Sequence, residues 1–199
     1  LHASLAPSEM CIRDSYNPEA ALADWEQAKK ELGVDQLELE LLISDADLSR
    51  KTAEYIQAQL ATNLPGLTIT IRSVPLQNRL EFQRALDFDF FYGTWAPDYQ
   101  DAMNFAEQYA TDGGINFGQY SNAEVDQLVE EARFDLANDP EQRRQALIQA
   151  EAIMIGQDAY GSALYQAANS YLLAPQVQGF EVLPFGRTIN LRTTYITAN

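Results

Sequence analysis

The sequence has few of the side chains that enzymes commonly use for nucleophilic and acid–base chemistry. Its 199 residues include one cysteine, Cys11, and one histidine, His2. A single cysteine forms no internal disulfide and no thiolate metal cluster, and a single histidine leaves little for general acid–base catalysis. We therefore expect no enzyme activity, no metal site and no cofactor. A hydrolase that works with two carboxylates, Asp98 with Asp101 or Asp89, stays open as an alternative.

Positive charge is scarce as well. The chain has 29 acidic residues against 13 lysines and arginines, which gives a formal net charge of -16. Binding of phosphate groups needs patches of basic side chains, and an anionic lipid surface would repel this chain. The composition therefore argues against nucleic acid as a partner and leaves cationic or zwitterionic ligands compatible.

Long apolar runs are absent too. No stretch reaches the ~20 consecutive apolar residues that a membrane-spanning helix needs. The chain opens on Leu1 rather than methionine, shows no signal peptide, and contains Glu9 where an apolar run would be expected. We expect the chain to be a fragment. Residues 1–15, which include a string typical of a translated sequencing adapter, are interpreted as a non-native or disordered leader, so Cys11 and His2 receive no functional role.

The patterns that are present predict an α/β fold. Apolar and polar residues alternate over 37–43 and again over 67–72, and a helical stripe over 48–63 separates them. Strand, helix and strand over this length form a βαβ unit, whose two strands are parallel. Further helices are expected over 18–32, 102–109, 123–136 and 140–156, and Ser121 is expected to cap the helix over 123–136. Another helix is expected from Leu76 to about 85, with Leu80 and Phe82 inward. Two strands are expected within 159–173.

The stretch from Leu86 to Phe105 is the most informative part of the chain. Phe88, Phe90 and Tyr92 share one face of a third predicted strand, which stops at Gly93. The loop that follows carries Trp95, a turn stiffened by Pro97, the acid Asp98 and the aromatic Tyr99. An open α/β sheet builds ligand sites in this way at the carboxyl ends of its strands. The alternative is a surface turn with Trp95 packed into the core.

Three motifs resemble those of a known family. Residues 16–21 read Tyr-Asn-Pro-Glu-Ala-Ala, residues 93–99 read Gly-Thr-Trp-Ala-Pro-Asp-Tyr, and residues 116–126 read Asn-Phe-Gly-Gln-Tyr-Ser-Asn-Ala-Glu-Val-Asp. In this order they resemble the C-terminal third of the peptide-binding proteins of ABC importers, the solute-binding protein family 5. One departure is Ala123, where the family has proline, and alanine is well tolerated at a helix start.

The resemblance implies a periplasmic-binding-protein-like lobe, with a mixed sheet flanked by helices, over residues 16–175. Residues 176–199 would then be the hinge and a strand-bearing return to a first lobe, and the rest of that lobe and the second lobe would lie outside this sequence. The implied protein is an extracytoplasmic monomer, in the periplasm or at the outer face of the membrane, with or without a lipid anchor. It would capture peptides and deliver them to ABC permease subunits.

The resemblance also implies a ligand site in which Asp98 binds the α-ammonium group of a peptide. Trp95 would form a wall for a side chain, and the backbone of residues 93–95 would pair with the extended peptide. The full set of expected ligand-binding residues is Gly93, Thr94, Trp95, Asp98, Tyr99, Asn116, Tyr120 and Ser121, with Asn104 a weaker candidate. The same fold with a sugar, an opine or a metal chelate as its ligand stays open.

Overall fold

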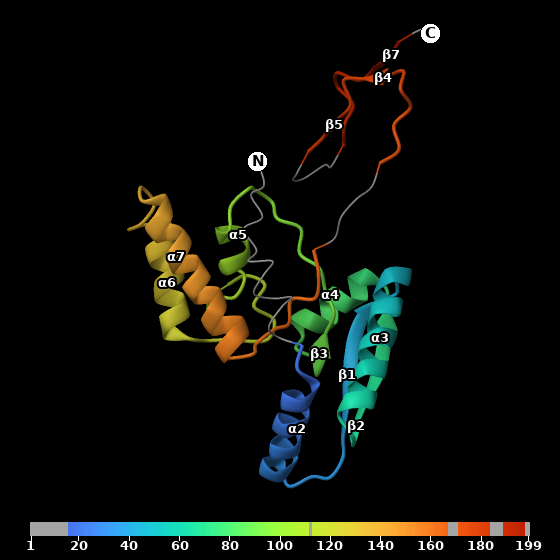
Figure 1. The fold of residues 1–199 in the computed structure, drawn as a ribbon, viewed down its shortest axis with the longest axis vertical. Helices are drawn as coiled ribbons and strands as arrows, with labels where there is room; N and C mark the ends of the chain where they lie inside the picture. The colour runs from blue at the N-terminus through green and yellow to red at the C-terminus, as the bar shows by residue number, and fades with distance from the viewer. Residues whose placement is uncertain (1–15, 112, 167–170, 184–188, 198–199) are drawn as a thin grey trace. The chain divides into compact units, whose positions relative to one another are not determined.

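The computed structural model describes residues 16–111, 113–166, 171–183 and 189–197. The described chain divides into two compact units, one that ends at Thr94 and one that begins at Trp95 (Figure 1). The expected leader, residue 112 of the predicted turn and residues 167–169 of the predicted strand pair lie outside the described residues. Each unit is described by itself below.

The first unit is built on a parallel sheet in the order β2-β1-β3. Strands β1 (Leu37–Ser44) and β2 (Leu67–Val74) pair in parallel over their whole length, and β1 pairs in parallel with β3 (Phe90–Phe91). Helix α3 (Asp47–Asn63) connects β1 to β2 and packs on both strands (Figure 1). The predicted βαβ unit is confirmed, whereas the mixed pairing expected for the sheet is not seen among these three strands.

The core of this unit follows from the central position of β1. Leu41, Leu42 and Ile43 are consecutive and all buried, because a central parallel strand is covered on both faces. Ala53 of α3, Ile69 of β2 and Tyr92 join Leu41 and Ile43 in one apolar cluster. Burial of each large aliphatic side chain contributes about 1.5–3 kcal/mol, so the three buried residues of this strand stabilise the unit substantially.

Helix α2 (Pro18–Leu32) begins and ends as the sequence predicts. Asn17 caps it by accepting a hydrogen bond from the backbone nitrogen of Ala20 at 3.0 Å, and Gly33 ends it with a positive φ of 68°. Trp25 is the buried residue of this helix, and its indole nitrogen donates to the carbonyl oxygen of Pro65 at 2.8 Å. The helix is thereby fixed to the turn that precedes β2.

Helix α4 (Leu76–Arg84) corrects one prediction. It buries Arg79 and Gln83, whereas Leu80 and Phe82 are only partly buried. Arg79 turns inward because its Nη1 donates to the carbonyl oxygen of Tyr92 at 2.8 Å. Phe82 is engaged elsewhere, since the guanidinium of Arg72 lies 3.7 Å from the centre of its ring. Polar partners therefore decide which face of this short helix points inward.

Strand β3 is also shorter than predicted. Phe90 and Phe91 pair with Leu41 and Leu42, and the backbone nitrogen of Tyr92 donates to the carbonyl oxygen of Leu42 at 3.0 Å. The carboxylate of Asp89 accepts the backbone hydrogen bond of Glu40 at 2.8 Å. The side chain of Asp89 thus takes the backbone N–H of Glu40 that a longer strand would use, and the ladder begins at Phe90.

The second unit has a helical core. It contains α5 (Met103–Ala106), α6 (Ala123–Arg133), α7 (Pro140–Glu151) and a π-helix, η1 (Ala152–Gln157), that continues α7. Met103, Val125, Val129, Leu147 and Ile153 are among the buried residues of one cluster between these helices. Asp139 caps α7 by accepting from the backbone nitrogen of Gln142 at 3.0 Å, so the helix starts at Pro140, where the sequence predicts it.

The cap of α6 is Asn122, not Ser121 as predicted. The side chain of Asn122 accepts from the backbone nitrogens of Glu124 at 2.9 Å and Val125 at 3.3 Å. Ser121 is exposed, and its hydroxyl oxygen instead accepts from Thr111 at 3.1 Å. The helix therefore starts one residue later than a box with Ser121 as its first member requires.

The C-terminal part of the chain contains two short antiparallel pairs. Strand β4 (Val177–Gln178) pairs with β7 (Tyr195–Ile196), and β5 (Glu181–Val182) pairs with β6 (Ile189–Asn190). Several apolar side chains here are exposed, for example Leu191 at 63% and Ile196 at 74%. The two strands predicted within 159–173 are not formed by the described residues of that stretch. Among the helices that the structure describes, none has the length and apolar character that crossing a bilayer requires.

Candidate functional site

The candidate loop leaves β3 at a point of close packing. Residues 92–97 have no regular secondary structure, and Gly93 and Thr94 are exposed. A Cβ atom on Gly93 would lie 2.9 Å from Nη1 of Arg79 and 3.2 Å from a ring carbon of Phe91. Glycine at this position lets the backbone pass close to the buried guanidinium that holds Tyr92.

Trp95 and Asp98 lie next in the loop and present their side chains to solvent. Trp95 is 40% exposed, so it is not packed into the core. Its indole nitrogen donates to Oδ1 of Asn104 at 2.8 Å, and the backbone nitrogen of Asp98 donates to the same oxygen at 3.3 Å. Asp98 is exposed, and its carboxylate takes part in none of the ion pairs found among the described residues. The loop thus offers an indole face and an acid.

Tyr99 connects this loop to α6. Its hydroxyl donates to Oε1 of Glu107 at 2.7 Å, and the other carboxylate oxygen of Glu107 pairs with Arg133 at 3.0 Å. The hydrogen bond to Glu107 is the main reason that the pKa of Tyr99 is raised above its usual value. Tyr99 is 43% exposed, so its ring remains accessible although its hydroxyl is engaged.

The two acids that the hydrolase alternative would combine with Asp98 have structural partners. Asp101 pairs with Arg143 at 2.9 Å and accepts from the backbone nitrogen of Met103 at 2.8 Å. Although burial pushes the pKa of Asp101 up, these hydrogen bonds bring it below its usual value. Asp89 holds the backbone of Glu40 in the first unit. The geometry therefore offers no support for a pair of catalytic carboxylates at these positions.

Asn116 organises a second group of expected site residues. Its amide nitrogen donates to the carbonyl oxygen of Tyr120 at 2.6 Å, and its Oδ1 accepts from the backbone nitrogen of Tyr120 at 2.9 Å and from the hydroxyl of Tyr160 at 3.1 Å. The Tyr160 hydroxyl in turn accepts from the backbone nitrogen of Gly118 at 2.9 Å. Asn116 is therefore a hub that shapes the loop ahead of α6.

Tyr120 is anchored as firmly. Its hydroxyl donates to Oδ2 of Asp158 at 2.5 Å, and the amide of Asn122 donates to the same oxygen at 2.8 Å. Burial and the hydrogen bond to Asp158 raise the pKa of Tyr120, while the hydrogen bonds from Tyr120 and Asn122 lower the pKa of Asp158. Sequence reasoning missed Asp158 and Tyr160, because no local pattern indicates that the end of the π-helix meets a loop some 40 residues earlier.

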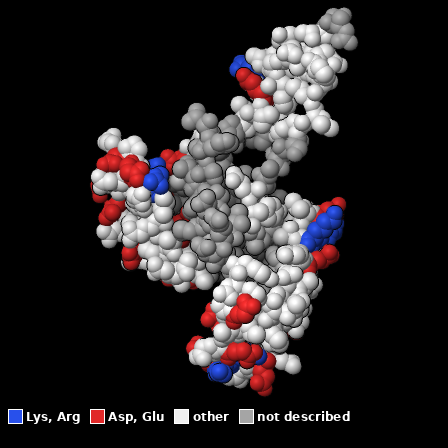
Figure 2. Space-filling model, viewed as in Figure 1, with Lys and Arg blue, Asp and Glu red and all other residues white. Residues whose placement is uncertain are grey.

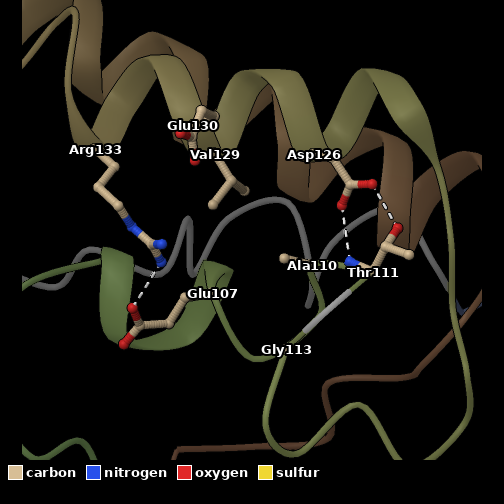
Figure 3. A pocket seen from close by; sticks show the side chains of 8 residues that line it. All are labelled: Glu107, Ala110, Thr111, Gly113, Asp126, Val129, Glu130 and Arg133. Carbon is tan, nitrogen blue, oxygen red and sulfur yellow. Dashed lines mark hydrogen bonds and ion pairs between the residues drawn. The ribbon is translucent and has the colours of Figure 1, made fainter.

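Thr111, the hydrogen-bond partner of Ser121, lines a pocket of about 340 Å³ in the second unit (Figure 3). In this view Glu107 meets Arg133 on one side and Thr111 meets Asp126 on the other, with Val129 between them. The pocket residues of α6 recur at positions 126, 129, 130 and 133. The sequence shows this helical spacing, but the same spacing is typical of any amphipathic helix, so it does not by itself indicate a pocket. The lining residues are Glu107, Ala110, Thr111, Gly113, Asp126, Val129, Glu130 and Arg133.

The surface chemistry agrees with the composition. Figure 2 shows acidic side chains distributed over the described parts of the visible face, with basic groups mostly beside them. Within the described ranges, no group of three or more histidine, cysteine or acidic residues is arranged to hold a metal ion. The second pocket, about 310 Å³ at the end of α2, is lined by residues such as Lys29, Lys30 and Asp35.

A parallel sheet whose strand runs at its carboxyl end into an exposed loop with an aromatic and an acid is typical of ligand-binding α/β proteins. The sequence model of the bacterial extracellular solute-binding proteins, family 5, middle region, matches residues 3–117. The chain belongs to this family, and the resemblance drawn from the three motifs and the predicted α/β class are confirmed. The match begins within the segment interpreted above as a leader.

Named relatives agree with this assignment. The chain is 29% identical over 188 residues to a dipeptide-binding protein of Lactococcus lactis, which spans 92% of this chain and 33% of the relative. It is 30% identical over 154 residues to a probable deoxycholate-binding periplasmic protein of Escherichia coli. That alignment covers 76% of this chain and 28% of the relative. The crystal structure of the substrate-binding domain of an oligopeptide ABC transporter from Bacillus anthracis superposes with a TM-score of 0.83 at 32% identity, covering 92% of this chain and 35% of that one. The chain thus spans about a third of the length of these proteins.

Proposed function

We propose that this chain is part of an extracytoplasmic receptor that captures peptides for an ABC importer, and that Asp98 binds the α-ammonium group of the peptide. The observation that carries the proposal is the exposed carboxylate of Asp98, unpaired with any basic group among the described residues, on a loop whose backbone is fixed by Asn104. The dipeptide-binding and oligopeptide-transporter relatives support peptides as the ligand class.

The chemistry of the loop suits a peptide terminus. An ammonium group that loses its water on binding is strongly destabilised unless an acid meets it, and such a contact is short and directional. The exposed face of Trp95 offers apolar area to a neighbouring side chain. The backbone of residues 93–95, which lies outside any strand, is available to pair with an extended peptide. Because backbone pairing ignores side chains, one receptor would accept many sequences.

The remaining parts of the proposal concern the whole protein. Residues 16–175 would form its C-terminal lobe, and residues 176–199 would cross the hinge to a first lobe, which would cover exposed apolar side chains such as Leu191 and Ile196. The protein would act as a monomer, without catalytic activity, in the periplasm or at the outer face of the membrane. It would deliver its ligand to the permease subunits of the transporter.

Calorimetric titration of the protein, expressed at the full length of its gene, tests the ligand class and the role of Asp98 together. A peptide with a free amino terminus should bind, and the same peptide acetylated at that terminus should not. Asp98→Asn should weaken binding by about 2–5 kcal/mol if the contact is buried on binding. Asp135→Asn, which changes an exposed acid of the same unit, is the matched control and should leave affinity unchanged. Equal affinity of wild type and Asp98→Asn would reject Asp98 as the anchor.

A second candidate ligand class follows from the deoxycholate-binding relative. The exposed rings of Trp95 and Tyr99 provide an apolar surface that a non-peptide solute would also use, a sugar or an opine included. An anionic solute is disfavoured here, because the chain carries a formal net charge of -16 and the loop presents an acid. Native mass spectrometry of the ligand that co-purifies with the protein separates these classes, since a peptide and a steroid acid differ in mass and fragmentation.

A further inference from the structure

Asn104 is the most buried polar side chain near the candidate loop. It lies in the four-residue helix α5 and is 1% exposed. A ligand would not reach it there, so the expectation that Asn104 is a weak ligand contact does not fit its position. A buried amide is instead expected to satisfy its hydrogen-bonding groups within the protein.

The partners of this amide are the residues proposed to bind ligand. Its Oδ1 accepts from the indole nitrogen of Trp95 at 2.8 Å and from the backbone nitrogen of Asp98 at 3.3 Å. The Asn104 side chain also lowers the pKa of the Tyr99 phenol, which opposes the larger upward effect of Glu107. One buried side chain therefore holds both the indole of Trp95 and the backbone of Asp98.

Asn104 is itself held in place by its surroundings. Its backbone nitrogen donates to the carbonyl oxygen of Asp101 at 3.1 Å, and its carbonyl oxygen accepts from the side chain of Gln108 at 2.9 Å. Met103, the preceding residue, is buried in the core between α5, α6 and α7. The backbone of Asn104 is thus held by Asp101, by Gln108 and by the packing of its neighbour Met103.

We propose that Asn104 is a positioning residue for ligand recognition, which sets the plane of the Trp95 indole and the backbone of Asp98 before the ligand arrives. The ligand part of this inference rests on the function proposed above. Preorganisation of this kind raises affinity because the loop has less freedom to lose on binding. An amide suits the role because it presents an acceptor and a donor at once, which neither a carboxylate nor an aliphatic side chain does.

The NMR signals of the two indole N–H groups test the hydrogen-bonding part without any ligand. Trp95 donates to Asn104, whereas Trp25 donates to the carbonyl oxygen of Pro65 at 2.8 Å in the other unit and serves as an internal control. Asn104→Leu, similar in shape but without polar atoms, should shift the Trp95 signal upfield and speed its exchange with water, while the Trp25 signal stays in place. Asn104→Asp, which keeps the acceptor, should restore the Trp95 signal.

Affinity for a peptide with a free amino terminus, measured on the protein at the full length of its gene, tests the ligand part. Asn104→Leu should bind about tenfold more weakly, the effect of roughly one lost hydrogen bond. Gln127→Ala, which removes an exposed amide of α6 in the same unit, is the control and should leave affinity unchanged. An unmoved Trp95 signal in Asn104→Leu would overturn the hydrogen-bonding part, and a moved signal with unchanged affinity would overturn the positioning role.

Two other outcomes are also decisive. Suppose that the wild-type protein binds no peptide while the Trp95 signal responds as expected. The proposed function and the ligand role of Asn104 are then both wrong, whereas the hydrogen bond between Trp95 and Asn104 is confirmed. If Asn104→Leu does not fold, Asn104→Ala, which also removes the acceptor, decides the matter. A folded Asn104→Ala with the Trp95 signal shifted supports the inference, and one with that signal in place contradicts it.

Discussion

Arg79 and Tyr92 form the link between the buried sheet of the first unit and the start of the candidate loop. Nη1 of Arg79 donates to the carbonyl oxygen of Tyr92 at 2.8 Å, and burial lowers the pKa of the guanidinium. Its Nε atom has no hydrogen-bond partner among the described residues, and the same holds for Oε1 of Gln83 one turn later. A buried cation is thus placed directly beneath Gly93.

Gly93→Ala is expected to destabilise the protein by about 1–3 kcal/mol, because overpacking a filled site displaces its neighbours. The added Cβ would lie 2.9 Å from Nη1 of Arg79, whose position is fixed by the Tyr92 carbonyl. Urea unfolding measures the effect. Gly114→Ala, where no atom lies within 4 Å of the added Cβ, is the control and should be close to neutral. Equal losses for the two variants would contradict the packing at Gly93.

Asn122→Ala and Ser121→Ala form a matched pair for the start of α6. Asn122→Ala should cost about 1 kcal/mol, since two backbone nitrogens at the helix start lose their acceptor. Ser121→Ala should stay within about 0.5 kcal/mol of wild type, because this exposed hydroxyl accepts from the side chain of Thr111 and caps no backbone nitrogen among the described residues. Thermal unfolding of both variants separates the two assignments. A larger loss for Ser121→Ala would restore Ser121 as the cap.

Asp158 should contribute to a loss of stability in acid. Hydrogen bonds from Tyr120 and Asn122 lower its pKa below the ordinary value of 3.8. A carboxyl with a lowered folded-state pKa stabilises the fold above its unfolded pKa, and this contribution disappears as the pH falls through the folded value. Asp158→Asn should therefore reduce stability at pH 7 and lose less of it on acidification from pH 5 to pH 2. Tyr120→Phe should flatten the acid response in the same direction, and parallel pH profiles of wild type and both variants would refute the assignment.

The elements with strong periodicity were predictable, and those decided by a single polar partner were not. The alternation in 37–43 and 67–72 predicts β1 and β2 because one apolar face must be buried. Asn17 and Gly33 predict the ends of α2 because their capping roles depend only on local backbone geometry. The inward turn of Arg79 depends on a carbonyl 13 residues away, which no local pattern indicates.

In the candidate site too, features that depend on local sequence were predictable, and features that depend on distant partners were not. The exposure of Trp95, Asp98 and Tyr99 is in accord with the loop that Gly93 and Pro97 predict. The roles of Asn116 and Tyr120 as internal anchors arise from Tyr160 and Asp158, which the sequence places far away. Sequence reasoning therefore identified the residues of the loop but not the network that supports its neighbours.

The π-helix η1 has a consequence for insertions and deletions in this part of the chain. A π-helical segment accommodates more residues per turn than an α-helix, so the six residues 152–157 fix the rotational phase between α7 and the residues after it. Removing one residue would change the direction in which the residues directly after the segment leave it. The Asp158 carboxylate would then no longer face the hydroxyl of Tyr120, from which it now accepts a hydrogen bond. The number of residues in this segment therefore matters more than their identity.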